Sequence, residues 1–361
     1  MSTPAASSQR EPSGSSGRLP AQTPSQTGGA KEPQTEGETP KLPGLDPNGI
    51  RIFGGNSVPK MTEGIAAVLG IKRAAADVSR FPDGEIKVRI LDDVRGRDCF
   101  VVQSTCPPVN DHLLEMLIII DALKRASADR ITAVMPYFGY GRQDRKHAGR
   151  VPITAKLIAN LITASGVDRL VTIDMHAAQM QGFFDIPVDH LFARPVFLKH
   201  IHKLHWQDPV ILCTDSGGLK VSHHLAAELN AELALIDKVR KSDVEVARGH
   251  VVGDIRDRDV IIIDDMIATG GSLVQAVNTA REYGARRILV LATHPVFCGR
   301  ALEHLSGLEI EEMVVTDTIP VKKRPENLKL TILSMDVLLA QAIRRTHKNE
   351  SISTLFEPGG Y

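Results

Sequence analysis

The stretch that decides the fold class is VIIIDDMIATGGS, Val260–Ser272, in a chain of 361 residues. It begins with four branched apolar residues, which is typical of a strand buried on both faces in a parallel sheet. Asp264 and Asp265 follow where we expect the strand to end, and residues 273–282 have the apolar spacing of an amphipathic helix. The stretch therefore predicts strand, acidic pair, glycine-containing turn and helix, the repeating unit of an α/β protein.

The turn after this strand has the features of a binding site for a phosphorylated sugar. Backbone N–H groups at the start of a helix bind phosphate, and Gly270 and Gly271 let the main chain approach a ligand closely. Two carboxylates at the C-terminal end of a strand can bind ribose hydroxyls or a metal ion that carries them. An ordinary β–α turn, with Thr269 or Ser272 as the helix cap, is the alternative interpretation.

Predicted strands and helices alternate along the chain from Ile50 onward. Two further predicted strands end in an acidic residue, Asp174 after residues 170–173 and Asp215 after the run PVILCT. This alternation, with short connections, predicts an α/β protein with mostly parallel sheets flanked by helices. Open α/β sheets bind ligands at the C-terminal ends of their strands, so the three acidic positions mark the expected site.

The length of the chain favours two domains, and its composition separates a tail from them. Residues 1–49 are rich in Ser, Thr, Pro, Gly and Gln and nearly lack large apolar side chains, so we expect a disordered tail. We then expect an N-terminal domain at residues 50–195, a C-terminal domain with the glycine turn at residues 196–345, and a C-terminal tail at residues 346–361.

Charge, cysteine content and the apolar runs exclude several classes of protein. The 43 Lys and Arg residues balance 43 Asp and Glu residues, which argues against a nucleic-acid binder with a basic surface. The 4 cysteines are widely spaced, which argues against a disulfide scaffold or a zinc site and suits a reducing compartment. No apolar run has the length of a membrane span. We therefore expect a cytoplasmic enzyme with no nucleic-acid or membrane partner.

Nine further motifs occur in a characteristic order along the chain. They are FPDGE, PYFGYGRQDRK, RVPITAKL, DMHAAQMQGFFDIPVDHL, TDSGG, DKVR, IDDMIATGGS, ATHPVF and AIRRTHKNESIS. Over residues 50–357 this set resembles the ribose-phosphate diphosphokinases, also called phosphoribosyl-diphosphate synthetases. The resemblance implies two domains of type I phosphoribosyltransferase-like topology. It also implies transfer of the diphosphoryl group of ATP to the 1-hydroxyl of ribose 5-phosphate, which releases AMP.

The resemblance places the adenine nucleotide at a hairpin and at a basic loop. The expected ATP-binding residues are Phe81, Asp83, Gly84, Glu85, Arg142 and Gln143. An aromatic ring can stack on adenine, a carboxylate can accept from its amino group, and an arginine can bind the polyphosphate. In relatives the hairpin residues come from a neighbouring subunit. Taken alone, the two segments would also fit a plain hairpin turn and a solvated charged loop.

The resemblance places a magnesium ion at His176 and Asp215, each of which follows a predicted strand. Mg²⁺ prefers oxygen ligands, so we expect the histidine to contact the ion through water. Asp174 lies two residues before the histidine, and we expect it to orient the imidazole. A structural histidine held by hydrogen bonds is the alternative.

In the family, a Lys-x-Arg pair lies on a flexible catalytic loop, and Lys238 and Arg240 match that pair. Such a loop can close over the substrates and stabilise the charge on the transferring phosphoryl groups. A charged strand end in solvent is the alternative. For ribose 5-phosphate, the resemblance implies contacts from Arg240, Asp264, Asp265, Ala268, Thr269, Gly270, Gly271 and Ser272.

Ala268 departs from the commonest form of the motif, since many relatives have an acidic residue at this position. Losing one hydrogen bond to a charged group costs about 1.5–3 kcal/mol. The departure favours an alternative function, a non-catalytic paralogue that regulates an active synthetase, but the intact catalytic and metal-site motifs argue against it. A phosphoribosyltransferase is a third hypothesis, and such an enzyme would not need the FPDGE or GRQDRK motif.

The resemblance also implies regulation and assembly. Arg95, Ser351 and Ser353 match positions that contact a regulatory phosphate in relatives, although a capped helix end with a loose tail would also fit. Active members are built from dimers, commonly as hexamers, because one site takes residues from two subunits. We therefore expect a homo-oligomer that binds ATP and ribose 5-phosphate.

Overall fold

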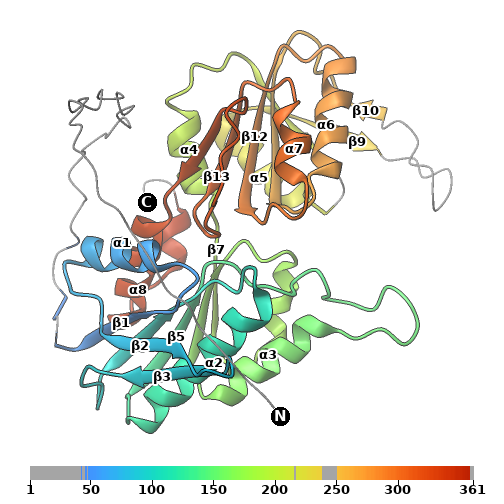
Figure 1. Ribbon diagram of the computed structural model, residues 1–361. Coiled ribbons are helices and arrows are strands. Elements are labelled where there is room, and N and C mark those ends of the chain that lie inside the picture. The colour runs from blue at the N-terminus through green and yellow to red at the C-terminus, as the bar shows by residue number, and fades with distance from the viewer. Residues whose placement is uncertain (1–41, 43–44, 47, 215–216, 238–249, 358–361) are drawn as a thin grey trace, which may run out of the picture. The chain divides into compact units, whose positions relative to one another are not determined.

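The computed structural model describes residues 42, 45–46, 48–214, 217–237 and 250–357 (Figure 1). The predicted tail at residues 1–49 lies almost entirely outside them. Within the described residues, strands and helices alternate along the chain and form a five-stranded sheet, a seven-stranded sheet and a two-stranded hairpin. The prediction of mostly parallel sheets flanked by helices is confirmed.

All neighbouring strands of the five-stranded sheet are parallel, in the order β1-β4-β5-β6-β7. Its strands are β1 (Ile50–Gly54), β4 (Asp98–Val102), β5 (Arg130–Met135), β6 (Arg169–Ile173) and β7 (Val188–Leu191). The helices of this part are α1 (Pro59–Leu69), α2 (Val109–Arg125), α3 (Thr154–Ser165) and the 3-10 helix η1 (Ala178–Phe183). The antiparallel hairpin of β2 (Ala76–Arg80) and β3 (Ile86–Ile90) contacts α2.

The seven-stranded sheet has the order β10-β9-β8-β11-β12-β13-β14, and its strands are parallel except for β10. Its first strands are β8 (Pro209–Cys213), β9 (Glu232–Asp237), β10 (His250–Val252) and β11 (Asp259–Ile267). Its last strands are β12 (Arg287–Pro295), β13 (Glu312–Thr316) and β14 (Leu330–Leu333). Helix α4 (Arg194–Ile201) precedes these strands, and α5 (Leu219–Leu229), α6 (Gly271–Glu282) and α7 (Ala301–Ser306) lie between them in the chain.

The side chains of β11 alternate between two hydrophobic cores. Ile261 and Ile263 pack in one core, and Val260 and Ile262 pack in another together with residues of α6. All four are buried, as predicted for a strand covered on both faces. The strand is longer than expected, since it continues past the acidic pair to Ile267 and stays paired with β12 there. The pair therefore projects from the strand itself.

Glycine ends the two helices at which the sequence predicts a stop. Gly70 caps α1 with φ +69°, and Gly166 caps α3 with φ +98°. This left-handed conformation suits a residue without Cβ, and the cap N–H groups of both glycines donate back into the last helical turn. The short elements β7, α4, α7, η1 and β10 were not predicted from the sequence.

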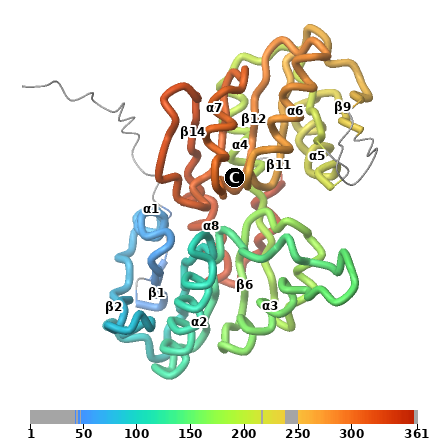
Figure 2. The backbone as a smooth tube through the Cα atoms, turned by 45° about the vertical axis from the view of Figure 1, so that its right-hand side comes forward, coloured from blue at the N-terminus to red at the C-terminus, as the bar shows by residue number. Residues whose placement is uncertain are grey.

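The last helix, α8 (Asp336–His347), packs against α1 rather than against the sheet that precedes it in the chain (Figure 2). Ile65 of α1 and Ile343 of α8 belong to the same buried core. At the end of α8, the Nδ1 of His347 lies 2.8 Å from the Oδ2 of Asp98 at the start of β4. The predicted domain boundary at residue 345 lies inside this helix.

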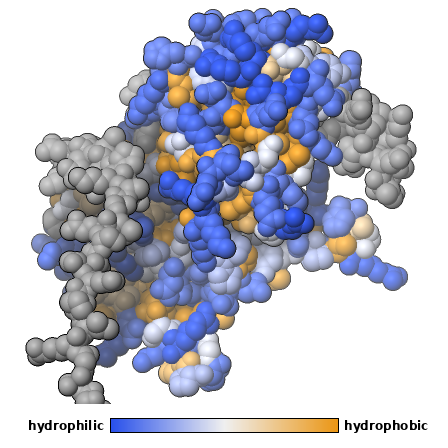
Figure 3. Space-filling view, turned by 45° about the horizontal axis from the view of Figure 1, so that its top comes forward, coloured by the Kyte–Doolittle hydropathy of each residue, from blue (hydrophilic) through white to orange (hydrophobic). Residues whose placement is uncertain are grey.

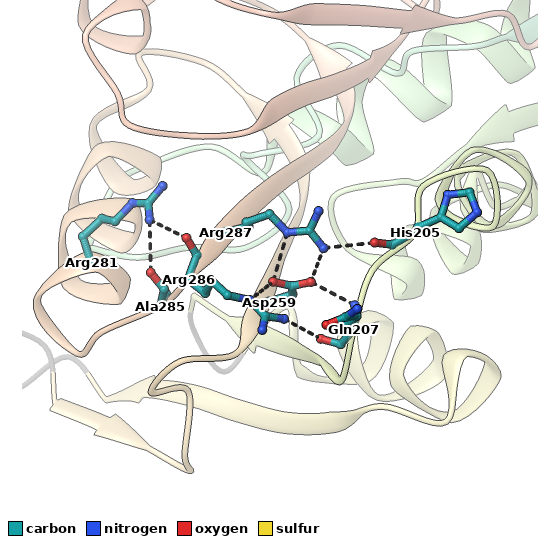
Figure 4. Close-up of polar contacts among 7 residues, drawn as sticks. All are labelled: His205, Gln207, Asp259, Arg281, Ala285, Arg286 and Arg287. Atoms are coloured by element: carbon teal, nitrogen blue, oxygen red, sulfur yellow. Dashed lines mark hydrogen bonds and ion pairs between the residues drawn. The ribbon is translucent and has the colours of Figure 1, made fainter.

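A buried carboxylate stabilises the N-terminal end of β11 (Figure 4). Asp259 is fully buried, and its Oδ1 accepts from Nε of Arg286 at 2.8 Å and from Nε of Arg287 at 3.1 Å. Its Oδ2 accepts from the backbone N–H of Gln207 at 2.9 Å. Burial alone would raise the pKa of Asp259, but the hydrogen bonds from the two arginines outweigh it and hold the pKa below its ordinary value. These contacts join β11 and β12 to the loop before β8.

On the face drawn in Figure 3, hydrophobic surface lies between areas of polar surface. Among the helices that the structure describes, none is long and apolar enough to cross a membrane. Cys99 and Cys213 are buried in strands, as expected for small apolar side chains, and all four cysteines are free thiols.

Candidate active site

The site centres on two residues that come from different sheets. His176 follows β6 of the five-stranded sheet, and Asp265 lies on β11 of the seven-stranded sheet. The Nδ1 of the histidine donates to the carboxylate Oδ2 of the aspartate at 2.7 Å, although 89 residues separate the two in the chain. The C-terminal ends of parallel strands from both sheets therefore meet at one place, which is where α/β sheets bind ligands.

Each side chain of this pair shifts the pKa of the other. The hydrogen bond that His176 donates to Asp265 raises the pKa of the imidazole, although burial acts in the opposite direction. Burial would raise the pKa of Asp265, but its hydrogen bonds with His176 and Asp264 outweigh burial and lower that pKa. Both shifts favour an imidazolium beside a carboxylate. The adjacent Asp264 turns back, and its Oδ1 accepts from the backbone N–H of Asp265 at 2.9 Å.

Asp174 does not orient the imidazole, so this expectation was wrong. Its Oδ2 accepts from the backbone N–H of Ala193 at 3.0 Å and from the hydroxyl of Thr293 at 2.7 Å. Burial raises the pKa of Asp174 to about 6. The backbone of Asp174 has φ +37°, which turns the chain sharply at the end of β6. Asp265, which is remote in sequence, takes the orienting role instead.

The turn after β11 has an open helix start. Gly270 is the N-cap of α6, with φ +80° and no side chain, so neither Thr269 nor Ser272 caps the helix as the plain-turn interpretation assumed. A Cβ at Gly270 would lie 3.2 Å from the side chain of Leu305, which leaves little room for another residue. Thr269, Gly271 and Ser272 are exposed. Backbone N–H groups of such a first turn are available to an anion.

The backbone of Ala268 is fixed although its side chain is small. Its carbonyl accepts from the backbone N–H of Cys298 at 2.8 Å, and the carbonyl of Ile267 accepts from Phe297 at 2.9 Å. The segment after β12 thus holds the start of the turn. An acidic side chain is absent here, whereas Asp264 and Asp265 lie four and three residues before Ala268.

The hairpin with the FPDGE motif presents its tip to solvent. Phe81, Asp83, Gly84 and Glu85 are exposed, and 47% of the Phe81 side chain is accessible. The turn is closed by the backbone N–H of Phe81 on the carbonyl of Glu85 at 2.8 Å, and Gly84 has φ +96°. The Nζ of Lys87 lies 5.8 Å from the centre of the Phe81 ring. The tip is well ordered but makes no contact with the pair His176–Asp265 among the interactions of the described residues.

The basic loop lies nearer to the pair, because it follows β5. Arg142 is exposed, and its charge acts on the buried Tyr137 hydroxyl, whose pKa is raised by burial and lowered by this arginine. The loop is attached to α3 at Gln143, whose carbonyl accepts from the backbone N–H of Ala155 at 3.2 Å. The side-chain amide oxygen of Gln143 also accepts from the hydroxyl of Thr154.

Comparison with known proteins identifies the family. Residues 50–166 match the N-terminal domain of ribose phosphate pyrophosphokinase, and residues 208–357 match the phosphoribosyl synthetase-associated domain. The chain is 49% identical over 313 residues to the ribose-phosphate pyrophosphokinase of Shewanella oneidensis, covering 85% of this chain and 98% of the relative. The chain belongs to the ribose-phosphate pyrophosphokinase family.

Other members of the ribose-phosphate pyrophosphokinase family are similarly close. The enzyme of that name from Wolinella succinogenes is 47% identical over 308 residues, with 85% of this chain and 99% of the relative covered. The crystal structure of phosphoribosylpyrophosphate synthetase from Mycobacterium smegmatis superposes with a TM-score of 0.78 at 41% identity. That match covers 83% of this chain and 99% of the other chain.

Three of the residues expected in a ribose-phosphate pyrophosphokinase site lie outside the described residues. They are Asp215, Lys238 and Arg240. Within the described part of the chain, no three His, Cys, Asp or Glu side chains form a cluster that could hold a metal ion. The structure therefore does not test the expected partner of His176 at the metal site.

The residues expected to bind a regulatory phosphate lie in two places in this family member. The hydroxyls of Ser351 and Ser353 are 2.8 Å apart, and Arg345 donates to the carbonyl of Ser351 at 3.0 Å. Arg95 is exposed on the turn before β4, where its backbone N–H donates to Asp93. Among the described residues, the structure shows no hydrogen bond or ion pair that joins Arg95 to either serine.

A set of buried polar residues near the pair His176–Asp265 was not predicted from the sequence. Thr293 and His294 on β12 are buried and contact the end of β6, and Thr318 after β13 is buried and contacts His294. The only signal was the motif ATHPVF, to which no function was assigned because its residues are neither acidic nor glycine-rich.

Proposed function

We propose that this protein is an active ribose-phosphate pyrophosphokinase. It transfers the diphosphoryl group of ATP to the 1-hydroxyl of ribose 5-phosphate and releases AMP, which supplies phosphoribosyl diphosphate for nucleotide biosynthesis. The observation that carries the proposal is the pair His176–Asp265, which joins the ligand-binding ends of both sheets beside the open start of α6. Two polyanionic substrates need such a site, because its cationic and N–H groups offset their charges.

Each part of the sugar phosphate has a corresponding group in this site. The 5-phosphate binds to the backbone N–H groups at residues 269–272, where Gly270 leaves the start of α6 open. Asp264 and Asp265 bind the ribose hydroxyls, because they project from β11 immediately before the turn. Arg240 adds a positive charge to the sugar phosphate. Ala268 contributes its backbone only.

The nucleotide occupies the side of the site formed by the basic loop. Arg142 and Gln143 bind the ATP phosphates and sugar, since this loop follows the C-terminal end of β5. Phe81 and the segment 83–85 reach the adenine of a neighbouring subunit, which accounts for an exposed aromatic ring on an ordered hairpin. The active form is therefore a homo-oligomer built from dimers, and a hexamer is the form that we propose.

Lys238 and Arg240 are the proposed catalytic residues. They follow β9 directly, and this strand lies beside β8 in the same sheet as β11. Two cations on one segment can stabilise the charge that spreads over the transferring phosphoryl oxygens. No side chain needs to form a covalent bond with the substrate in such a transfer.

A magnesium ion fits the polar groups of this site. When bound, Mg²⁺ would supply positive charge that offsets the charge of the phosphates. Mg²⁺ usually keeps several waters and takes few protein ligands. His176 and Asp215 would hold it. Because Nδ1 of His176 is bonded to Asp265, only Nε2 of the ring is directed at the water shell.

The same proposal covers location and regulation. We place the enzyme in the cytoplasm, where its free cysteines stay reduced, and without nucleic-acid or membrane partners. Arg95, Ser351 and Ser353 are proposed contacts of a regulatory phosphate. The alternative, a non-catalytic regulatory paralogue, is not favoured, because the relatives at 45–49% identity carry the name of the active enzyme.

AMP release from ATP tests the function directly. We expect release that depends on ribose 5-phosphate in the wild-type protein, and a loss of about hundredfold or more in Lys238→Ala. Lys60→Ala, an exposed lysine at the start of α1, is the matched control and keeps wild-type activity. If the wild type released no AMP while Ala268→Asp did, the chain would be the regulatory paralogue.

A further inference from the structure

The end of β6 is joined to the seven-stranded sheet by buried polar groups that the proposed chemistry does not use. His294 of β12 is 1% exposed, and its Nε2 lies 3.2 Å from the carbonyl oxygens of both Ile173 and Asp174. Thr293, its neighbour, donates to the carboxylate of Asp174 at 2.7 Å. In addition, the hydroxyl of Ser104 after β4 donates to the carbonyl of Thr318 at 2.6 Å.

The protonation of His294 follows from its neighbours. A carbonyl oxygen only accepts hydrogen bonds, so Nε2 must carry a proton. Nδ1 lies 2.9 Å from the hydroxyl of Thr318. Burial lowers the pKa of His294 to about 4, so the ring is neutral near pH 7 and Nδ1 is an acceptor. The carbonyls of Ile173 and Asp174 thus select the tautomer with the proton on Nε2. The Thr318 hydroxyl, which also lies 3.0 Å from the carbonyl of Thr293, can donate to Nδ1 in that tautomer.

His294 lies between the segments that carry His176 and Asp265. On one side it holds the two carbonyls directly before Met175 and His176. On the other side its backbone is paired with Met266, the residue after Asp265, in the parallel register of β12 and β11. The ring of Tyr137 packs edge-on against the imidazole, with centroids 4.9 Å apart. One buried side chain therefore spans the two strand ends that carry His176 and Asp265.

We propose that His294, with its proton on Nε2 and Thr318 on Nδ1, is a positioning residue that sets the separation of His176 and Asp265. This role deepens the proposed function and presupposes it. The imidazole touches no substrate, because it is buried beneath the strand ends. Its hydrogen bonds fix the distance between the start of the loop that carries His176 and strand β11. His176 and Asp265 can therefore act together on one bound substrate complex.

Substitutions at position 294 separate hydrogen bonding from packing. His294→Gln keeps an N–H donor at about the reach of Nε2, whereas His294→Leu fills much of the volume without a donor. We expect kcat to fall about ten- to hundredfold in His294→Leu, with the KM for ATP within about twofold, because a shift of about 1 Å in a site costs about that much. His294→Gln should recover most of the rate.

Two further variants keep the test decisive. His347→Gln is the control, because it removes a partly buried hydrogen bond to Asp98 at the opposite end of the five-stranded sheet. This variant should be less stable than the wild type but should keep the same kcat. Thr318→Val is a milder change for use if His294→Leu does not fold. Its loss of rate should lie between those of the two variants at position 294, and Thr318→Ser should restore the wild-type rate.

Hydrogen exchange gives a readout that does not depend on activity. We expect the amides of residues 174–176 to exchange about tenfold or more faster in His294→Leu than in the wild type or His347→Gln. Should the wild type release no AMP, the proposed reaction fails, and the exchange data alone decide the positioning role. Wild-type kcat and exchange in a folded His294→Leu protein would overturn it, as would equal loss in His294→Gln and His294→Leu.

Discussion

Some residues of the site contact neighbours in the sequence, and others contact residues that are far away in the sequence. The turn around Gly270 is local, so its strand, glycines and helix could be predicted from the adjacent residues 260–282. The pairing of His176 with Asp265 joins two sheets and could not be predicted from spacing. Asp174 was assigned to His176 because the two are close in sequence, but burial at the end of β6 commits its carboxylate to Ala193 and Thr293.

The charge of Asp265 is predicted to be essential for turnover. Asp265→Asn keeps the size of the side chain but removes the negative charge that pairs with His176 and that we propose binds the sugar hydroxyls. We expect kcat/KM for ribose 5-phosphate to fall about hundredfold, corresponding to about 2.7 kcal/mol. Steady-state AMP release measures the loss. Asp254→Asn changes an exposed carboxylate that accepts from the backbone N–H of Arg256, and it should behave as wild type. Equal activity in both variants would contradict the assignment.

Two buried carboxyl groups, those of Asp317 and Asp336, lie near the start of α8. Asp317 follows β13, and its Oδ1 accepts from the backbone N–H of Met335 at 2.9 Å. Burial raises the pKa of Asp317 to about 7, and the nearby charge of Asp336 acts in the same direction. Burial likewise raises the pKa of Asp336 to about 6. Both groups therefore favour the protonated form in the folded protein.

This arrangement predicts a loss of stability with rising pH. Because the pKa of Asp317 is raised from 3.8 to about 7, its contribution is complete below pH 3.8 and disappears as the pH rises to about 7. About three pKa units correspond to at most about 4 kcal/mol. In Asp317→Asn, the decline of Tm between pH 5 and pH 8 should be smaller than in the wild type. Circular dichroism measures it, with exposed Asp121→Asn as control; identical pH profiles would refute the prediction.

Long periodic elements were predicted well, whereas short ones were not. The helices α1, α2, α3, α6 and α8 carry apolar residues at helical spacing over 11 to 17 residues, which gives a clear signal. β7 has only four residues, and their burial does not alternate; α4 has only eight residues. Apolar patterns this short also occur by chance in loops, so they do not predict a strand or a helix. β11 continues beyond its apolar run because β12 supplies hydrogen bonds as far as Ile267, regardless of side-chain type.

For the molecule as a whole, the C-terminal segment belongs to the folded core. The 3-10 helix η2 (Ser353–Phe356) buries Leu355 completely, and Phe356 packs edge-on against Phe192 with ring centroids 5.3 Å apart. The expectation of a separate tail at residues 346–361 was based on composition, which does not show that two apolar side chains fit a distant core. Deleting residues 351–361 would therefore remove core packing together with any phosphate contact.

Point substitutions distinguish these two effects. Leu355→Ala should destabilise the protein by about 2–5 kcal/mol, because it leaves a cavity in a buried core. The double variant Ser351→Ala and Ser353→Ala removes two exposed hydroxyls and should change stability by less than about 0.5 kcal/mol. Urea unfolding measures both. If the serines bind a regulatory phosphate, only the double variant loses activation by inorganic phosphate while its stability stays at the wild-type level.

The contact between α1 and α8 also orders events during synthesis. Domains generally fold from the N-terminus as the chain leaves the ribosome. The side of α1 that Ile343 of α8 covers stays exposed until nearly the whole chain has been made, since about 270 residues separate the two helices. The first helix of the fold thus receives its partner last, and a nascent chain that stalls before residue 336 presents an uncovered apolar helix to chaperones.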